Sequence, residues 1–176
     1  MELLVTIAVL SIVLTIAIPS FTSFIADSRT SAARNKLTSS ISLARSEAIK
    51  TGAQAVICRR NANANTCAGN STSGTAAWSN GWLVYADADE DTVLDAGELV
   101  RVVEDLPEQT TITFAGGDLL RFDNLGALVR TGTGEQIFAV SDSADSSKGQ
   151  ALSILPTGRV RTCVDWNVVG QTCDDS

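Results

Sequence analysis

The sequence predicts an α+β protein in which one long N-terminal α-helix packs on an antiparallel β-sandwich or roll. Up to Gly52 the chain has helical patterns: an uncharged apolar run comes first, and a polar segment with a single apolar stripe follows. Beyond Gly52, short apolar segments alternate with turns rich in Gly, Asn and Asp, which is typical of antiparallel sheets. With 176 residues the chain is long enough for a helical anchor and one domain with a core.

The helix begins with an apolar run from Leu3 to Ile18 that carries no charge. These sixteen residues form about 24 Å of helix, which is shorter than the ~30 Å hydrocarbon core of a bilayer. Glu2 stands at the head of the run, and an acidic group there is costly in a membrane unless a cation neutralises it. No small-residue cleavage site follows, so we expect residues 1–25 to be retained as a transmembrane helix.

Pro19 marks the change to a second, amphipathic half of the helix. Its missing N–H cannot bond to the carbonyl of Thr15, which predicts a kink rather than an end. Over residues 26–52 polar side chains dominate and the apolar ones recur every three or four residues, so this half needs a domain to pack against. Gly52 is the expected stop. The apolar stripe consists of Leu37, Ile41, Ala44 and Ala48.

Residues 53–176 are predicted to form one globular β-domain, because no internal repeat or long linker divides them. The segment Asn61–Ala77 is rich in Asn, Thr, Ser and Gly and is expected to be a surface loop. Strands are expected at Gln54–Arg60, Trp82–Ala86, Leu99–Glu104, Thr110–Ala115, Leu119–Asp123, Gln136–Ser141, Ala151–Leu155 and Arg159–Val164.

The four cysteines fall into two pairs that are close in sequence, Cys58 with Cys67 and Cys163 with Cys173. An even number of cysteines in an exported domain indicates disulfide bonds. Bonds within each pair are favoured because short loops close readily, and a Cys58–Cys163 bond between the two regions is the alternative. None of the spacings is the CxxC of a zinc or thioredoxin site, so the sequence does not favour zinc.

Composition and charge exclude several classes of function. The net charge of −7 argues against a protein that binds nucleic acid through its overall charge. The chain has no histidine, which removes Ser-His, Cys-His and HExxH chemistry. Carboxylates are numerous, but no nucleophile or base motif accompanies them, so the chain is not expected to be an enzyme.

An acidic segment between two expected strands has the spacing of a calcium loop. Its carboxylates stand at relative positions 1, 3, 5, 9 and 12, as the oxygen ligands of an EF-hand do. The sixth position is Thr92, where an EF-hand has glycine, and no helices are expected on either side. A polar hairpin tip without metal and a calcium site therefore both stay open, and no other cofactor is expected. The five candidate ligands are Asp87, Asp89, Asp91, Asp95 and Glu98.

Two arginines near the C-terminus, Arg159 and Arg161, follow a Pro156-Thr157 turn. In a strand they point to the same face about 7 Å apart, near the spacing of successive phosphates. They are candidates for binding DNA, and a structural or salt-bridging role is the alternative.

The N-terminal sequence ELLVTIAVLSIVLTIAIPSF, residues 2–21, resembles the start of type IV pilins and type II secretion pseudopilins. Glu2 matches the acidic residue of that family, and Pro19 matches its helix-kinking proline. In the family a prepilin peptidase removes a short basic leader that ends in Gly, and the mature chain starts Phe-Thr-Leu-Ile-Glu. These residues do not stand before Glu2 in this sequence, so we expect them in a full-length precursor on which the peptidase acts.

Four downstream motifs narrow the resemblance to the GspH/FimT group of minor pseudopilins and minor pilins. The resemblance implies a pilin-like fold and a minor subunit that primes or caps a type IV pilus or a type II secretion pseudopilus, with other major and minor pilins as partners. It also implies a single-pass protein of the bacterial inner membrane whose periplasmic globular domain later joins the filament. The motifs are Ala44-Arg45-Ser46-Glu47-Ala48-Ile49, the Cys58 and Cys67 pair, Trp78-Ser79-Asn80-Gly81-Trp82-Leu83-Val84-Tyr85 and Gly158-Arg159-Val160-Arg161.

The last of these motifs, Gly158-Arg159-Val160-Arg161, resembles the GRxR motif that DNA-binding minor pilins of the group carry near their C-terminus. The resemblance implies an alternative function, in which Arg159 and Arg161 bind DNA during its uptake in natural transformation.

Overall fold

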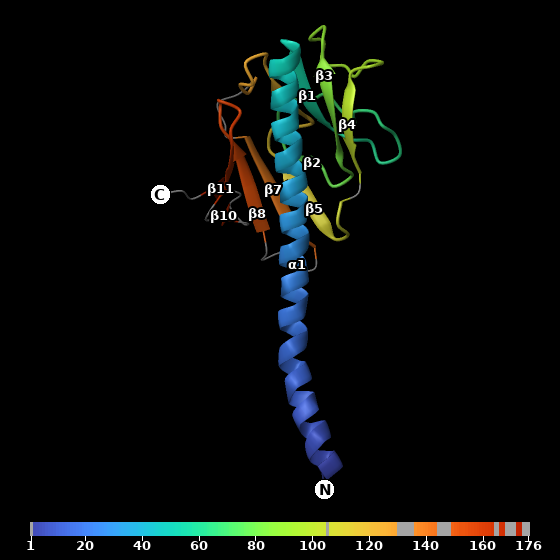
Figure 1. Cartoon of the computed structure of the whole chain (residues 1–176), viewed down its shortest axis with the longest axis vertical. Helices are drawn as coiled ribbons and strands as arrows, with labels where there is room; N and C mark the ends of the chain where they lie inside the picture. The colour runs from blue at the N-terminus through green and yellow to red at the C-terminus, as the bar shows by residue number, and fades with distance from the viewer. Residues whose placement is uncertain are drawn as a thin grey trace.

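A computed structural model describes residues 2–104, 106–129, 136–143, 149–163, 166–167 and 172–173; within these ranges the side chains of residues 2, 8, 13–19, 167 and 172 lie outside the description. One long helix runs the length of the molecule, and strands pack beside its C-terminal half only (Figure 1). The N-terminal half of the helix extends away from the strands.

The helix α1 spans Glu2–Thr51 without interruption, which corresponds to about 75 Å. It continues through Pro19, as expected for a proline that does not end the helix. Gly52 closes its last turn, since the Gly52 N–H donates to the carbonyl of Ala48 at 3.0 Å. The φ of Gly52 is 70°, the left-handed conformation of a helix C-cap, so the predicted stop is confirmed. Among the described residues, no helical segment combines the length and the apolar character that a membrane crossing requires.

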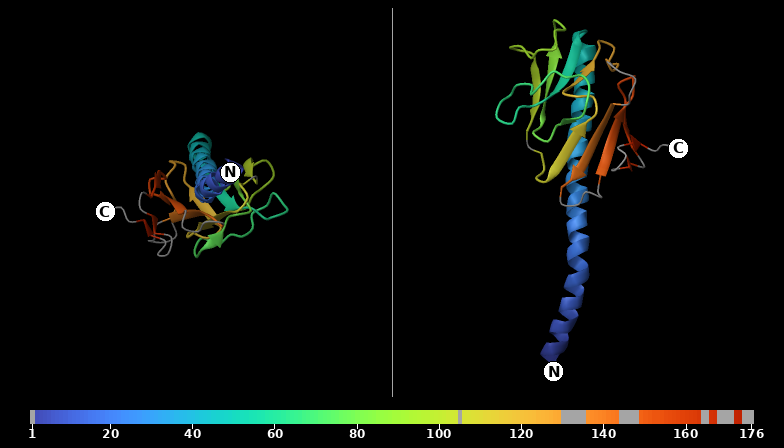
Figure 2. Two further views of the ribbon diagram at one scale, coloured as in Figure 1. Left: turned by 90° about the horizontal axis from the view of Figure 1, so that it is seen from below. Right: turned by 180° about the vertical axis from the view of Figure 1, so that it is seen from behind.

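Two antiparallel sheets and a short ribbon make up the strands, and both sheets lie on the same side of α1 (Figure 2). The first sheet has the order β4-β3-β1-β6, the second has the order β2-β5-β7-β8-β9, and β10 pairs with β11. The strands are β1 Gln54–Arg59, β2 Ala76–Ala77, β3 Trp82–Asp87, β4 Leu99–Val103, β5 Thr110–Phe114, β6 Leu119–Phe122, β7 Gln136–Asp142, β8 Gly149–Ile154, β9 Val160–Thr162, β10 Trp166–Asn167 and β11 Thr172–Cys173.

All eight strands expected from the sequence are present, and their described ends agree within two residues. Val164, the expected end of the last of them, lies outside the described residues. The strands β2, β10 and β11 were not expected, because each has two residues and is too short to show an alternating pattern. The strand β2 corrects the expectation that the whole segment Asn61–Ala77 is a loop.

The core lies between α1 and the inner faces of the two sheets. The four residues of the predicted stripe, together with Ala33, have no exposed surface, which confirms the amphipathic half of the helix. Three of these five positions are alanine, so the helix backbone approaches the strands closely. From the sheets, Ile57 and Val84 on one side and Phe138 and Leu152 on the other join the same cluster. The helix therefore contributes to a single core shared by both sheets.

Trp78 anchors the aromatic part of this core. Its ring meets Phe114 and Phe138 edge-on, with ring centroids 5.5 and 5.1 Å apart. Its indole N–H donates to the carbonyl of Gly117 at 3.0 Å, so the polar atom of this buried side chain is satisfied. Phe114 of β5 and Phe138 of β7 are paired across the two strands, and their rings stack with centroids 4.0 Å apart.

Two arginines of α1 tie the helix to the loops at the ends of the sheets. Arg29 lies 3.7 Å from a carboxylate oxygen of the buried Asp142. Arg45 donates from Nε to the carbonyl of Gly126 at 2.9 Å and from Nη2 to the carbonyl of Thr157 at 3.3 Å. These polar contacts fix the rotation of the helix on the apolar core.

Disulfide bonds join Cys58 to Cys67 and Cys163 to Cys173. Both bonds are therefore local, and the alternative Cys58–Cys163 pairing is absent. The first bond connects β1 to the loop that follows it over a separation of 9 residues. On the chain-entropy model, closing a loop of this size stabilises the fold by roughly 2–3 kcal/mol.

Gly158 is expected to be essential to the turn that Arg45 holds. A Cβ added at Gly158 would lie 2.1 Å from the carbonyl oxygen of Gly126, whereas nothing lies within 4 Å of one added at Gly52, and both glycines have positive φ. We expect Gly52→Ala to lower the free energy of unfolding by about 1 kcal/mol, the cost of left-handed alanine. Gly158→Ala should lower it by a further ~1–3 kcal/mol, because the neighbouring backbone must move.

Urea unfolding of the full chain in detergent, followed by tryptophan fluorescence, measures both changes. Equal losses in the two variants would contradict a packing role for Gly158.

Candidate functional site

The N-terminal half of α1 extends away from the strands (Figure 1), and the large apolar side chains described on it are exposed. Each is 56–70% exposed, and they face outward all around the helix. A helix that is apolar all round is stable only when lipid or other helices surround it. The side chains of Glu2 and Pro19 lie outside the described part, so their expected roles in assembly stay predictions. The exposed residues are Leu3, Leu4, Val5, Ile7, Val9, Leu10, Ile12, Phe21 and Phe24.

The acidic loop predicted as a metal site connects β3 to β4. Asp87 is the last residue of β3, and Asp89 and Asp91 follow it in the loop. One carboxylate oxygen from each of these three residues lies within 4.8 Å of the other two, which is close enough for all three to contact a single ion. The structure therefore brings together three of the five ligands expected from the sequence.

Asp87 is the buried member of this cluster. It has no exposed surface, and its Oδ1 has no hydrogen-bond partner. The other oxygen, Oδ2, accepts the N–H of Thr92 at 3.1 Å. Burial raises the pKa of Asp87, the hydrogen bond from Thr92 partly offsets this, and the carboxylates of Glu98 and Asp91 raise it again. A second negative charge nearby and the loss of water both disfavour the ionised form of Asp87 in the absence of a cation.

Thr92 occupies the sixth position of the loop in a conformation that glycine normally supplies. Its φ is 66°, and that of Glu90 is 62°. A β-branched residue rarely adopts positive φ, so the loop must hold it there. Tyr85 contributes, since its hydroxyl donates to the carbonyl of Thr92 at 2.8 Å, and burial raises the pKa of this hydroxyl, which keeps it a donor. A threonine at this position argues against a calcium loop in the sequence, but the backbone of Thr92 has the positive φ that glycine supplies in such loops.

The two remaining candidate ligands, Asp95 and Glu98, lie apart from the cluster. Glu98 accepts the N–H of Ala88 with one carboxylate oxygen and the N–H of Asp95 with the other, both at 3.0 Å. It thereby ties the end of the loop to its beginning. The carboxylate of Asp95 is exposed and lines a neighbouring groove.

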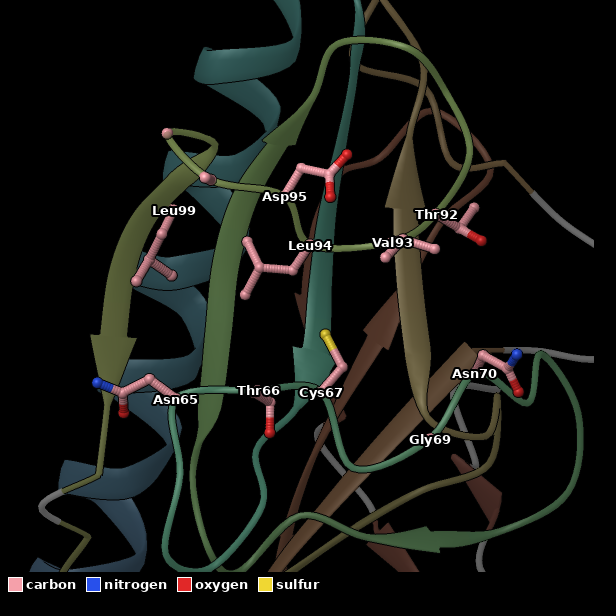
Figure 3. Close-up of a pocket in the computed structure, with 12 residues that line it drawn as sticks. Asn65, Thr66, Cys67, Gly69, Asn70, Thr92, Val93, Leu94, Asp95 and Leu99 are labelled. Carbon is pink, nitrogen blue, oxygen red and sulfur yellow. The ribbon is translucent and has the colours of Figure 1, made fainter.

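This groove, of about 720 Å³, separates the acidic loop from the loop of the first disulfide bond (Figure 3). Cys67 and Asn70 line one side, and Val93 and Leu94 line the other. Val93 is 55% exposed, so the groove offers apolar surface. No local sequence pattern predicts this groove. It forms because β1 and β3 are adjacent in the sheet, which brings the two loops together.

The predicted arginine pair lies at the free edge of the five-stranded sheet. Arg159 and Arg161 are both exposed, and they flank Val160, which packs on the core. Arg159 closes a tight turn, because its carbonyl accepts the N–H of Leu155 at 2.9 Å. Arg161 lies in β9 opposite Ser153 of β8. The alternation predicted for a strand thus places both arginines away from the core.

Two of the sequence motifs meet in space at this turn. Arg45, from the motif on α1, donates to the carbonyl of Thr157, and its Nε would lie 2.7 Å from a Cβ added at Gly158. No sequence pattern predicts this contact between Arg45 and the turn at Gly158. The close approach requires glycine at position 158, and it brings a third guanidinium group to the turn that precedes Arg159.

The chain matches a family model described as Type II transport protein GspH over residues 33–158. No curated protein matches it in sequence. Two crystal structures of the type IV minor pilin FimU of Pseudomonas aeruginosa, strain PAO1, are similar in fold. One has a TM-score of 0.55 and 19% identity and covers 77% of this chain and 88% of that chain. The other has a TM-score of 0.51 and 21% identity and covers 75% and 90%.

At these identities the FimU structures support the fold alone, a long N-terminal helix packed on antiparallel sheets, as the sequence predicted. The family model extends from the amphipathic half of α1 to Gly158 and covers well over half of the chain, including the turn held by Arg45. The chain therefore belongs to the GspH family.

Proposed function

We propose that this protein is a minor pilin or pseudopilin that joins a filament through the apolar half of α1. The observation that carries the proposal is the set of apolar side chains from Leu3 to Phe24, each 56–70% exposed. Burying one such side chain contributes about 1.5–3 kcal/mol, so the set strongly favours association with neighbouring helices. Membership of the GspH family and the likeness to a minor pilin support the same function.

The two halves of α1 have different tasks in this proposal. The buried stripe from Leu37 to Ala48 fixes the globular domain to the helix, and the exposed half stays available for neighbouring subunits. Because α1 is a single helix, the packing of its apolar half also determines where the globular domain lies on the filament. The function is structural and requires no catalytic step.

Before assembly, the uncharged run from Leu3 to Ile18 holds the chain in the bacterial inner membrane, and the globular domain faces the periplasm. Extraction then replaces lipid contacts by contacts between helices. In the filament the subunit primes or caps a type IV pilus or a type II secretion pseudopilus. Two disulfide bonds support an oxidising compartment for the domain.

Phe24 provides a direct test of the assembling surface, because it is 69% exposed. Phe24→Gln is expected to lower the amount of the subunit in sheared filaments several-fold, since it removes apolar area from the helix. Leu125→Gln is the matched control: it changes a side chain that is 79% exposed on the globular domain, and incorporation should stay normal. Immunoblots of sheared filaments, normalised to the membrane fraction, compare the two. Normal incorporation of Phe24→Gln would contradict the proposal.

Glu2 is expected to act in assembly rather than in membrane insertion. In the family this acidic residue pairs with the amino terminus of a neighbouring subunit, and such pairing compensates for a charge in apolar surroundings. Glu2→Ala in the full-length precursor should leave the amount in the membrane unchanged and block entry into filaments. Fractionation followed by immunoblotting of both pools measures this, and wild-type amounts in the filament pool would count against the pairing.

A second candidate function is DNA binding during uptake, and the exposure of Arg159 and Arg161 favours it. Both side chains flank Val160 on the edge of the second sheet, and Arg45 adds a guanidinium group at the preceding turn. With a net charge of −7, the chain can bind DNA only through a local patch of this kind. The alternative is that the two arginines have only a structural or salt-bridging role on the surface of the domain.

Arg159→Gln combined with Arg161→Gln tests this second function. If the pair contacts phosphates, the wild-type chain binds duplex DNA weakly, the logarithm of affinity falls by about 0.9 per logarithmic unit of salt for each phosphate neutralised, and the variant loses binding. Lys50→Gln with Arg101→Gln is a control with the same change of charge at exposed positions. Electrophoretic shift titrations at two salt concentrations measure all three chains. Equal binding by both variants, or no shift of the wild type at low salt, would exclude the pair as a DNA site.

A further inference from the structure

We propose that the loop from Asp87 to Glu98 binds one calcium ion, with the carboxylates of Asp87, Asp89 and Asp91 as its first ligands. The inference goes beyond assembly and does not depend on it, since it concerns only the connection between β3 and β4 in the globular domain. Three carboxylate oxygens that lie within 4.8 Å of one another form the centre of the site.

The buried Asp87 is the strongest reason to place a cation here. Its Oδ1 is shielded from solvent and accepts no hydrogen bond, and a buried charged oxygen without a partner is costly. The carboxylate of Asp87 belongs to the same cluster as those of Asp89 and Asp91, so the residue with the unsatisfied oxygen lies beside two further negative charges. A divalent cation at this point satisfies Oδ1 and neutralises the repulsion among the three carboxylates.

Backbone N–H groups of the loop hold the carboxylates of Asp87 and Asp91 in place. Asp87 uses Oδ2 to accept the N–H of Thr92 at 3.1 Å, and Asp91 uses Oδ1 to accept the N–H of Val93 at 2.7 Å. Each bond occupies one carboxylate oxygen and leaves the other for an ion. The left-handed conformation of Thr92 produces the sharp turn that an EF-hand achieves with glycine.

The chemistry of the donors selects calcium. All the candidate donors are oxygen atoms, which suit hard cations, and the chain has no histidine. Ligand oxygens on opposite sides of one calcium ion are about 4.6–5.2 Å apart, whereas magnesium requires about 4.0–4.2 Å and strict octahedral geometry. Calcium also accepts six to eight oxygen ligands in flexible geometry, which suits a group of carboxylates on one irregular loop.

Asp95 and Glu98, expected from the sequence as ligands at positions 9 and 12, lie apart from the cluster of three carboxylates in the structure. Both oxygens of Glu98 already point back to the loop, where they accept the N–H groups of Ala88 and Asp95 at 3.0 Å. A carboxylate oxygen that accepts one hydrogen bond keeps a lone pair for a metal. Glu98 therefore ties the ends of the loop together without a metal, and calcium bound at Asp87, Asp89 and Asp91 would hold the segment that precedes Val93 and Leu94, which line the groove of Figure 3.

Terbium is a suitable probe because it replaces calcium at oxygen sites and emits when a nearby aromatic ring transfers energy to it. Tyr85 contacts the loop through its bond to Thr92, so a bound terbium ion should show sensitised emission that calcium displaces. The experiment uses the full chain in detergent after treatment with EDTA. Thermal unfolding with millimolar calcium, or the same concentration of magnesium, provides a second measurement, because binding to the folded state raises Tm by mass action.

Asp89→Asn and Glu90→Gln form a matched pair of variants. Both residues are exposed neighbours in the loop and both changes remove one negative charge, but only Asp89 belongs to the cluster. We expect Asp89→Asn to weaken calcium binding roughly tenfold or more, because it removes a charged ligand, and Glu90→Gln to leave it nearly unchanged. Asp87→Asn should abolish both the emission and the calcium-dependent rise in Tm.

Three results would overturn the proposal: no sensitised emission from the wild type, equal weakening in Asp89→Asn and Glu90→Gln, or equal rises in Tm with calcium and magnesium. Equal weakening or equal rises would mean that the loop attracts cations only through its overall charge.

Discussion

Helix α1 contacts β1 and β3 in one sheet and β7 and β8 in the other, and the rest of the fold depends on this shared contact. The two sheets share one core, and the apolar stripe from Leu37 to Ala48 covers it from the side of the helix. Arg29 and Arg45 then fix the helix at two separate places, the end of β7 and the turn at Gly126. Since the same helix continues beyond the domain with an apolar surface, any force that acts on the exposed half is transmitted to the core through one rigid element.

Local pattern was sufficient to predict the helix and most of the strands, because alternation and periodicity are properties of short segments. The stripe on α1 and the stop at Gly52 are of this kind. The spacing of Asp87, Asp89 and Asp91 likewise predicted that their carboxylates would lie together. The burial of Asp87 could not be predicted, since it depends on where the end of β3 lies in the sheet. The groove beside the loop and the contact of Arg45 with the turn before Arg159 also depend on strand order, which no local signal contains.

The candidate sites occupy different parts of the molecule. The acidic loop follows β3 in the first sheet, whereas Arg159 and Arg161 lie at the outer edge of the second sheet, on the other flank of α1 (Figures 1 and 2). The apolar surface for assembly lies on the extended half of the helix, away from both. A bound cation, a bound polyanion and neighbouring subunits would therefore not compete for the same surface.

The position of β9 at the end of the strand order has a consequence for solubility. A strand at the edge of a sheet offers unpaired N–H and C=O groups to any other extended chain, and proteins commonly prevent such pairing with charged side chains. Arg159 and Arg161 place two positive charges on this edge, within or next to a strand of three residues. Two copies that approach edge to edge would bring these guanidinium groups together and repel each other. The arginine pair thus disfavours edge-to-edge pairing of the sheets in a protein that we propose to assemble through its helix.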